Sequence, residues 1–202
     1  MQFGVNHLGH FLLTELLLPK LIESAPSRIV NTSSVGHAAW TALGQSVPHS
    51  TIDFDDLMFK ERKYDPMVSY GQSKLANVLH ALHLAKLMEE KKVDVTVVSH
   101  HPGWVATDLV RSVMPVWVQN YLIKPFRRDV MDIHGGAQVA LHCLLDPSVP
   151  QHSGKFFSQT GLYQDKKAAM GGLPMESPNP EAKDEKVAER LYKVSRELVK
   201  LD

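Results

Sequence analysis

The sequence predicts an α/β protein with an open, doubly wound parallel sheet, and three consecutive segments carry that prediction. Residues 28–34 and 94–99 are short β-branched runs, as in buried parallel strands. Between them, residues 68–90 repeat apolar side chains at helical spacing. A strand, a long crossover helix and a second strand form a right-handed βαβ unit. Ligands bind such sheets at the carboxyl ends of the strands, so the polar residues that follow both runs are the first candidates for a site.

The remaining elements are expected around this unit. The opening residues read as a helix in which Pro19 gives a bend or a change of pitch. Asn179 is a suitable N-cap, with Pro180 at the first helical position, and predicts a terminal amphipathic helix. In chain order, we expect a helix over 1–23, a long loop over 36–67 with an acidic turn at 53–57, a helix over 133–145, a strand over 155–157 and the terminal helix over 179–201.

An apolar segment over 109–130 allows several interpretations. It carries Trp117 and Tyr121 and ends in basic residues. It could pack over the sheet as a helix-loop-helix, close over a substrate as a lid, or contact a membrane surface. We favour packing or a lid over the membrane contact.

Composition excludes several classes of function. Lys plus Arg and Asp plus Glu are both 22 among 202 residues, so no net charge attracts nucleic acid. Cys143, the single cysteine, excludes an internal disulfide framework and is expected to be a buried, inert thiol. There is no signal peptide and no apolar run of roughly 18 residues that would span a membrane.

Histidine pairs raise the question of a metal site. His7 and His10, and likewise His80 and His83, are spaced three apart on predicted helices. Neither pair has Glu or Cys partners at the spacings that zinc sites use. We therefore expect no metal.

The most informative spacing is Tyr70 to Lys74, four residues apart on the crossover helix. Such residues share one helix face, and a cation beside a phenol lowers its pKa from about 10 toward the range useful for proton transfer. The spacing alone also fits a solvated helix face. A second copy, Tyr163 to Lys167, lies in a Gly- and Lys-rich stretch that reads as surface loop.

Topology brings further polar groups toward this pair. Ser34 ends the first strand, and residues 102–107 follow the second. Asn6 lies in an otherwise apolar helix, where its amide needs a fixed water or a backbone partner. The site is therefore expected to combine these groups with Tyr70 and Lys74.

The motifs around these residues resemble those of short-chain dehydrogenases/reductases. They are Asn6 in NHLGHFLLT, Ser34 in VNTSS, Tyr70 and Lys74 in YGQSKLAN, and HPGWVAT from His101 to Thr107. Their order and spacing are similar to the retinol dehydrogenase and WW-domain oxidoreductase branch, and the resemblance extends to the terminal helix.

This resemblance implies a role for each residue. Tyr70 would be the general acid/base, and Lys74 would lower its pKa and bind the nicotinamide ribose. Ser34 would orient the substrate oxygen, and Asn6 would hold a water in a proton relay toward Lys74. The residues implied in cofactor binding are Tyr70, Lys74, Pro102, Gly103, Val105 and Thr107.

The implied activity is hydride transfer between a nicotinamide dinucleotide, NADP rather than NAD, and a hydrophobic alcohol or carbonyl such as a retinoid or lipid aldehyde. A competing hypothesis is a truncated, inactive isoform that acts as a dimerisation or interaction module through helices 3–23 and 68–90. The resemblance also implies an intracellular protein, either cytoplasmic or attached to an organelle membrane, with peripheral membrane contact as an alternative for the chain itself.

One part of the family pattern is missing. The sequence has no glycine-rich turn of the kind that cradles a pyrophosphate at a helix N-terminus. We therefore interpret residues 1–202 as a single, incomplete domain, the C-terminal part of a Rossmann-type fold without its N-terminal βαβ half. Two expectations follow: the strand at 28–33 has an unpaired edge, and the chain binds dinucleotide weakly or not at all, which calorimetric titration with both cofactors would test.

Overall fold

The computed structural model describes residues 1–42, 45–105, 130–159 and 161–201. Its α-helices are α1 (Gly9–Glu23), α2 (Pro66–Glu90), α5 (Ile133–Leu145) and α6 (Glu185–Val199). Its strands are β1 (Ser27–Thr32), β2 (Trp40–Ala42), β3 (Gln45–Val47), β4 (Val95–His101), β5 (Trp104–Val105), β6 (Val130–Met131), β7 (Phe156–Ser158) and β8 (Gly172–Met175). Shorter turns are a π-helix at Gly4–Leu8 and 3₁₀ helices at Val35–His37, Val149–His152, Ala168–Met170 and Pro180–Lys183.

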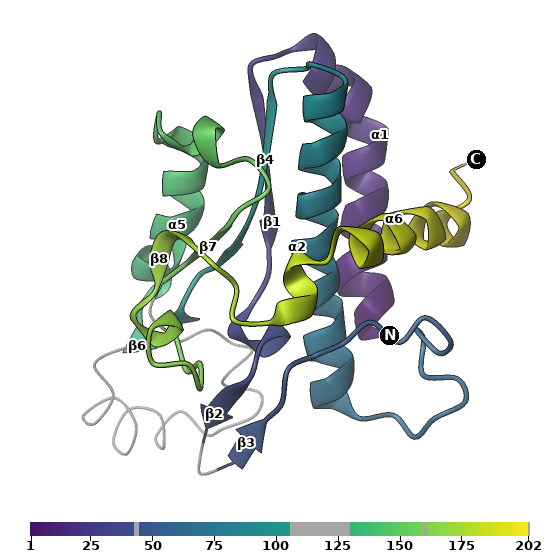
Figure 1. The fold of residues 1–202 in the computed structure, drawn as a ribbon, viewed down its shortest axis with the longest axis vertical. Helices are drawn as coiled ribbons and strands as arrows, with labels where there is room; N and C mark the ends of the chain where they lie inside the picture. Colours follow the sequence, from purple (N-terminus) through teal and green to yellow (C-terminus); the bar gives the residue numbers. More distant parts are fainter. Residues whose placement is uncertain (43–44, 106–129, 160, 202) are drawn as a thin grey trace.

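Three layers make up the fold. The main sheet has the strand order β1-β4-β7-β8, with β1, β4 and β7 parallel and β8 antiparallel to β7. α1 and α2 cover one face and α5 covers the other (Figure 1). The predicted α/β class, with a mostly parallel sheet between helical layers, is therefore confirmed. In the described part of the chain β1 is an edge strand, as expected.

The strand β4 explains why the sequence is apolar without alternation at this point. All seven of its residues are buried. Val97 faces the core beneath α1 and α2, while Val98 faces the core beneath α5 with Cys143 and Phe157. Burial raises the pKa of the Cys143 thiol to about 12, which agrees with an inert cysteine.

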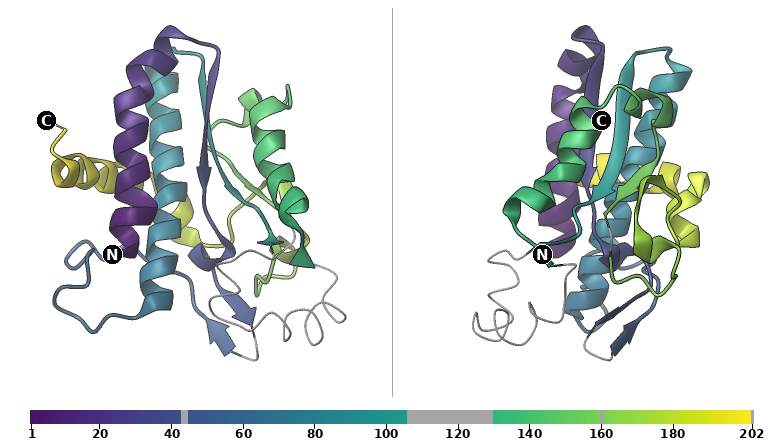
Figure 2. Two further views of the ribbon diagram at one scale, coloured as in Figure 1. Left: turned by 180° about the vertical axis from the view of Figure 1, so that it is seen from behind. Right: turned by 90° about the vertical axis from the view of Figure 1, so that its left-hand side faces the viewer.

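β1 and β4 end together, and this sets the position of the site. Their register pairs Ser27 with Val95 and Thr32 with His100. α2 connects β1 to β4 in the βαβ unit. It lies beside α1 and runs antiparallel to both strands (Figure 2). The segments that follow β1 and β4 therefore emerge at the same edge of the sheet.

The first helix differs from the prediction in where its pitch changes. The change lies in the π-helix Gly4–Leu8, not at Pro19, which is accommodated inside α1. A π-turn widens the helix locally, and such turns often occur at functional sites. Here it contains Asn6 and His7.

The prediction of an unstructured loop over 36–67 was wrong in its first part. A 3₁₀ turn follows Ser34, and β2 pairs with β3 as an antiparallel hairpin. Strands of three residues are too short to display a period of two, so no local pattern predicts them. Trp40 also bridges to Tyr163, which is 5% exposed and hydrogen-bonds Ser158, so the second Tyr-x-x-x-Lys copy begins in the core rather than on a surface loop.

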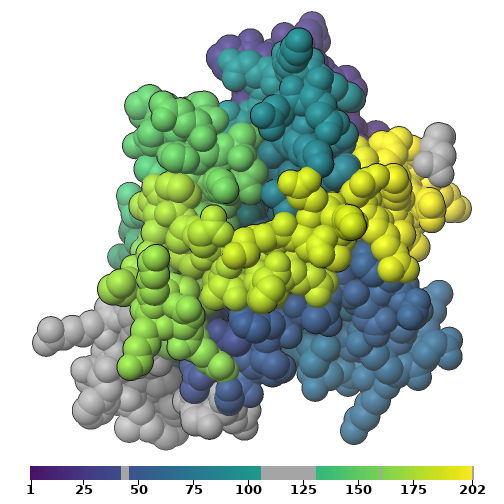
Figure 3. All heavy atoms as spheres, in the orientation of Figure 1, coloured from purple at the N-terminus to yellow at the C-terminus, as the bar shows by residue number. Residues whose placement is uncertain are grey.

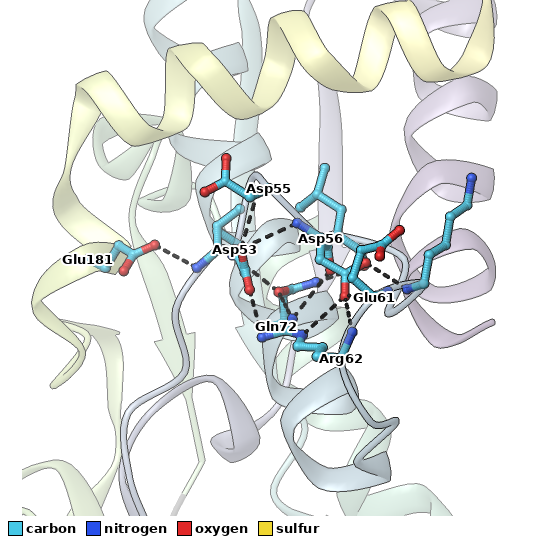
Figure 4. Close-up of polar contacts among 10 residues, drawn as sticks. Asp53, Asp55, Asp56, Glu61, Arg62, Gln72 and Glu181 are labelled. Carbon is cyan, nitrogen blue, oxygen red and sulfur yellow. Dashed lines mark hydrogen bonds and ion pairs between the residues drawn. The ribbon is translucent and has the colours of Figure 1, made fainter.

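Polar contacts hold the second part of that loop, which contains the acidic turn at 53–57, in place (Figure 4). The carboxylate of Asp56 accepts hydrogen bonds from the backbone N–H groups of Lys60, Glu61 and Arg62. Arg62 in turn lies 2.8 Å from the carboxylate of Asp53 and donates to the side chain of Gln72 on α2. The predicted acidic turn is thus anchored to α2.

Helix boundaries are set by capping side chains. Asp65 accepts from the N–H groups of Met67 and Val68, so α2 begins at Pro66, two residues before the prediction. The predicted terminal helix consists of two pieces, because Asn179 caps the short 3₁₀ helix and Asp184 caps α6.

The C-terminal segment crosses the molecule rather than extending the sheet. Figure 3 shows it as a continuous yellow band across one face, and α6 packs against α2 with Ala188 and Leu191 buried. None of the described helices has the length and apolarity needed to cross a membrane.

Candidate active site

A cleft of about 580 Å³ opens at the carboxyl ends of β1 and β4. Ligands bind open α/β sheets at this edge. The cleft is mostly apolar, with a few polar groups on one wall. Its lining consists of Thr32, Ser33, Ser34, Val35, Trp40, Tyr70, Lys74, His101, Pro102, Gly103, Trp104, Val105, Ile133, Gly136, Gly161 and Leu162.

Ser34 and Tyr70 lie together on this wall. Ser34 caps the 3₁₀ turn, and its hydroxyl oxygen accepts from the N–H of Gly36 at 3.2 Å. The same side chain interacts with the Tyr70 phenol and lowers its pKa. The structure therefore brings together two of the residues predicted from the sequence.

The pKa of Tyr70 shifts in the direction opposite to the prediction. Burial raises the pKa of its phenol above the ordinary value, and the Ser34 side chain opposes that rise. We expected Lys74 to lower this pKa. The lysine Nζ lies 5.7 Å from the centre of the tyrosine ring.

Lys74 donates to the backbone carbonyl of Thr32, with 3.4 Å between Nζ and the oxygen. Burial lowers the pKa of the Lys74 amine. The lysine thus sits in the cleft beside Tyr70 but is held by the end of β1.

Asn6 lies behind the cleft rather than in its lining. Its amide donates to Ser73 Oγ at 3.1 Å, and the Ser73 hydroxyl donates to the Tyr70 carbonyl at 2.7 Å. The predicted water or backbone partner is replaced by a side-chain hydroxyl, because the π-helix places Asn6 against the buried face of α2. Asn6 is therefore linked through the Ser73 hydroxyl to the backbone of Tyr70, and not to its phenol.

Of the residues implied in cofactor binding, Pro102, Gly103 and Val105 line the same cleft as Tyr70 and Lys74. Gly103 has φ +90°, and a Cβ there would come within 2.0 Å of Met131 Cε, so only glycine fits this turn. Thr107 and the proposed lid at 109–130 lie outside the described residues, except for Val130 and its strand β6.

Several lining residues were not predicted. Trp40 and Leu162 come from the hairpin and the Tyr163 segment, whose approach to the site has no local sequence signal. His101 begins the HPGWVAT motif, but no role was predicted for it. It is buried, and burial lowers its pKa from 6.5 to about 3, so it lines the cleft as a neutral ring.

The described residues contain no cluster of metal ligands. No three His, Cys, Asp or Glu side chains among them are grouped so that they could hold an ion. His7 and His80 instead lie in the aromatic cluster with Phe11.

The mostly parallel sheet with serine, tyrosine and lysine at its carboxyl edge places this chain in the class of α/β proteins with an oxidoreductase-type fold. The comparison with known proteins then gives the family. Human retinol dehydrogenase 13 is 40% identical over 205 residues, covering 100% of this chain and 54% of that protein. Bovine retinol dehydrogenase 12 is 42% identical over 198 residues, covering 98% of this chain and 54% of that protein. The chain belongs to the short-chain dehydrogenase/reductase family, an NAD(P)-dependent oxidoreductase family, and spans about half the length of these relatives.

Solved structures agree with this assignment. An uncharacterised protein from Mycobacterium paratuberculosis matches with a TM-score of 0.67 and 28% identity, covering 98% of this chain and 58% of that one. A 7α-hydroxysteroid dehydrogenase in complex with NADH has a TM-score of 0.53 at 21% identity, covering 77% of this chain and 51% of that one, and so supports the fold alone. No protein-family profile matches the chain.

Proposed function

We propose that this chain supplies the acid–base and substrate side of an oxidoreductase site that reduces hydrophobic carbonyl compounds. The placement of Ser34 and Tyr70 together in the wall of an apolar cleft is the observation that carries this proposal. The cleft supplies room for a substrate, and the pair supplies two hydroxyl groups for one substrate oxygen.

Tyr70 would act as the proton donor. Because burial raises its pKa, the phenol stays protonated at neutral pH, which is the form needed to protonate a carbonyl oxygen. Ser34 would hold the same oxygen and stabilise the charge that develops on it.

The nicotinamide end of a dinucleotide would be held by the residues that follow β4. Pro102, Gly103 and Val105 line the same cleft as Tyr70, and Lys74, also in that lining, would bind a ribose hydroxyl. When bound, this group would supply the hydride. For this chain we propose NADP as the preferred form, with NAD as the alternative.

The substrate is proposed to be a retinoid or another lipid aldehyde. Val35, Trp40, Ile133 and Leu162 give the cleft apolar walls, and these favour a greasy chain over a charged one. The names of the relatives, retinol dehydrogenases 12 and 13, point to the same class.

Tyr70→Phe tests the acid/base role. The variant keeps the ring and its packing, so we expect unchanged stability and a loss of retinal reduction of roughly 10² to 10⁴-fold. NADPH and NADH should be compared in the same assay. A parent chain that reduces retinal at a rate unchanged in the variant would rule out the proposed role of Tyr70.

A second candidate function is a dimerisation or interaction module, and one observation favours it. α1 exposes Leu13, Leu16 and Leu17 at 56%, 62% and 49%, at helical spacing along one side. Most of α2 is buried within the chain, so the contact would use α1 more than α2.

Sedimentation of the parent chain and of Leu16→Glu tests this alternative. A concentration-dependent dimer that the substitution abolishes, together with no carbonyl reduction by the parent chain, would favour the module over the enzyme. A monomer at all concentrations would exclude it.

A further inference from the structure

We propose that Asn77 is a positioning residue for Lys74 and Asn6, and that it stands at the end of a buried hydrogen-bond relay beginning at Ser195 on α6. This inference rests on the proposed function, because it gives the relay the role of positioning Lys74, a residue of the proposed site. The relay joins the C-terminal helix to the wall of the cleft.

Asn77 holds two backbone carbonyls with one amide group. Its Nδ2 donates to the carbonyl of Asn6 at 3.0 Å and to that of Thr32 at 3.0 Å. Both hydrogens of the amide are thus used, and the side chain is 6% exposed. Since carbonyls only accept, the amide nitrogen must face them and Oδ1 must face the other way.

That orientation fixes the next member of the relay, His7. Asn77 Oδ1 lies 3.2 Å from His7 Nδ1 and can only accept, so His7 carries its proton on Nδ1. His7 Nε2 is then an acceptor and lies 2.9 Å from the Ser195 hydroxyl, which must donate. His7 and Ser195 are both fully buried, and burial lowers the pKa of His7 to about 4, which agrees with a neutral ring.

The relay reaches the site through the carbonyl of Thr32. This oxygen accepts from Lys74 Nζ as well as from Asn77, so the amide fixes the acceptor toward which the lysine points. The same amide also binds the carbonyl of Asn6 and so fixes the π-helix, from which the Asn6 side chain donates to Ser73. One residue outside the cleft therefore positions two of the residues predicted for the site.

A purely structural role would make a different prediction from a positioning role. Gln72 provides the comparison, because it is also a buried amide on α2 that donates to a backbone carbonyl, that of Leu57 at 3.0 Å. It has no contact with Thr32 or Lys74 among its hydrogen bonds. Loss of either amide should cost stability, but only loss of Asn77 should change Lys74.

The experiment is an NMR titration of the Lys74 ε-carbon in the parent chain, in Asn77→Leu and in Gln72→Leu, with the signal assigned by Lys74→Arg. In Asn77→Leu the Thr32 carbonyl accepts from Lys74 alone, so we expect the lysine midpoint to rise by on the order of half a pH unit. Gln72→Leu should leave it in place. An unchanged or lowered midpoint in Asn77→Leu, or an equal rise in Gln72→Leu, would overturn the inference.

A second measurement does not depend on the folding of Asn77→Leu. Imidazole ¹⁵N shifts at neutral pH should show His7 as the Nδ1–H tautomer, with an Nε2 shift that changes in Ser195→Ala and returns in Ser195→Thr. Finding the Nε2–H tautomer would refute the relay. Neither readout uses catalysis, so a failed Tyr70→Phe assay with the expected lysine and histidine shifts would discard the proposed activity while leaving this hydrogen-bond arrangement intact.

Discussion

The ring of Tyr70 packs directly against Gly36: a Cβ at Gly36 would lie 3.0 Å from Tyr70 Cε1. Contact this close is tighter than side chains normally tolerate, so the absence of a side chain at position 36 sets how near the phenol comes to Ser34. Gly36 follows Ser34 by two residues in the same 3₁₀ turn. The turn therefore controls both partners of the pair.

Gly36→Ala should displace the Tyr70 ring by a few tenths of an ångström and weaken the interaction of its phenol with Ser34. We expect carbonyl reduction to fall roughly tenfold, because small misplacements of reacting groups are costly. The rate and the ¹³C shift of the Tyr70 phenol carbon measure the effect. Gly9→Ala, at an exposed helical position, should change neither; an unaltered rate and shift in Gly36→Ala would show that the ring relaxes freely.

Gly71→Ala should destabilise the fold. A Cβ at Gly71 would come within 2.0 Å of Ser50 Oγ and 2.6 Å of the Gly36 carbonyl, and the second of these is backbone that cannot swing aside. We expect a loss of about 1–3 kcal/mol in the free energy of unfolding, measured by urea denaturation.

Gly9→Ala is the matched control for this substitution. Its Cβ would meet only the Gly4 carbonyl at an ordinary 3.6 Å, so alanine should leave stability unchanged or raise it by up to about 1 kcal/mol. A loss of similar size in both variants would mean that crowding at Gly71 is not the cause.

Stability should fall steeply in mild acid. Burial lowers the pKa values of His7 and His37 from 6.5 to about 4. Because the folded-state values lie below the unfolded ones, this contribution is fully present above pH 6.5 and is lost as the pH falls toward 4, at about 3 kcal/mol for each ring.

Urea denaturation at a series of pH values measures that loss. His37→Gln and His7→Gln should each flatten the decline between pH 6.5 and 4, whatever they do to stability at neutral pH. His10→Gln, at an exposed position of the same helix, should preserve the slope of the parent chain. A decline that both buried-histidine variants retain in full would assign acid lability to other groups.

Arg62→Ala should loosen the loop between Asp53 and Tyr64. The arginine joins Asp53, Asp56 and Gln72 in the cluster of Figure 4. Because these ion pairs are partly open to solvent, we expect only about 1 kcal/mol of lost stability, but a several-fold rise in proteolytic cleavage within the loop. Lys63→Ala should not change the cleavage; equal rates for both variants would contradict the anchoring role of Arg62.

Much of the fold could be predicted because its main strands and helices have recognisable local sequence patterns. The β-branched runs at β1 and β4 and the helical spacing of α2 placed Ser34, Tyr70 and Lys74 on the correct elements. The hairpin β2–β3 could not be predicted, since its pairing depends on Trp40 meeting Tyr163, far along the chain. The terminal helix was expected as one piece and was interrupted by the cap at Asp184.

Periodicity and capping residues act over a few neighbouring positions, so the βαβ unit and the edge of the sheet where the site forms could be predicted locally, as could the family motifs. The surroundings of each group depend on the tertiary structure. Burial raises the pKa of Tyr70. The Lys74 ammonium donates to the Thr32 carbonyl rather than to the phenol, and His7 hydrogen-bonds Ser195, which lies near the other end of the chain. Desolvation and hydrogen-bond partners depend on segments that are distant in sequence, and no local pattern records them.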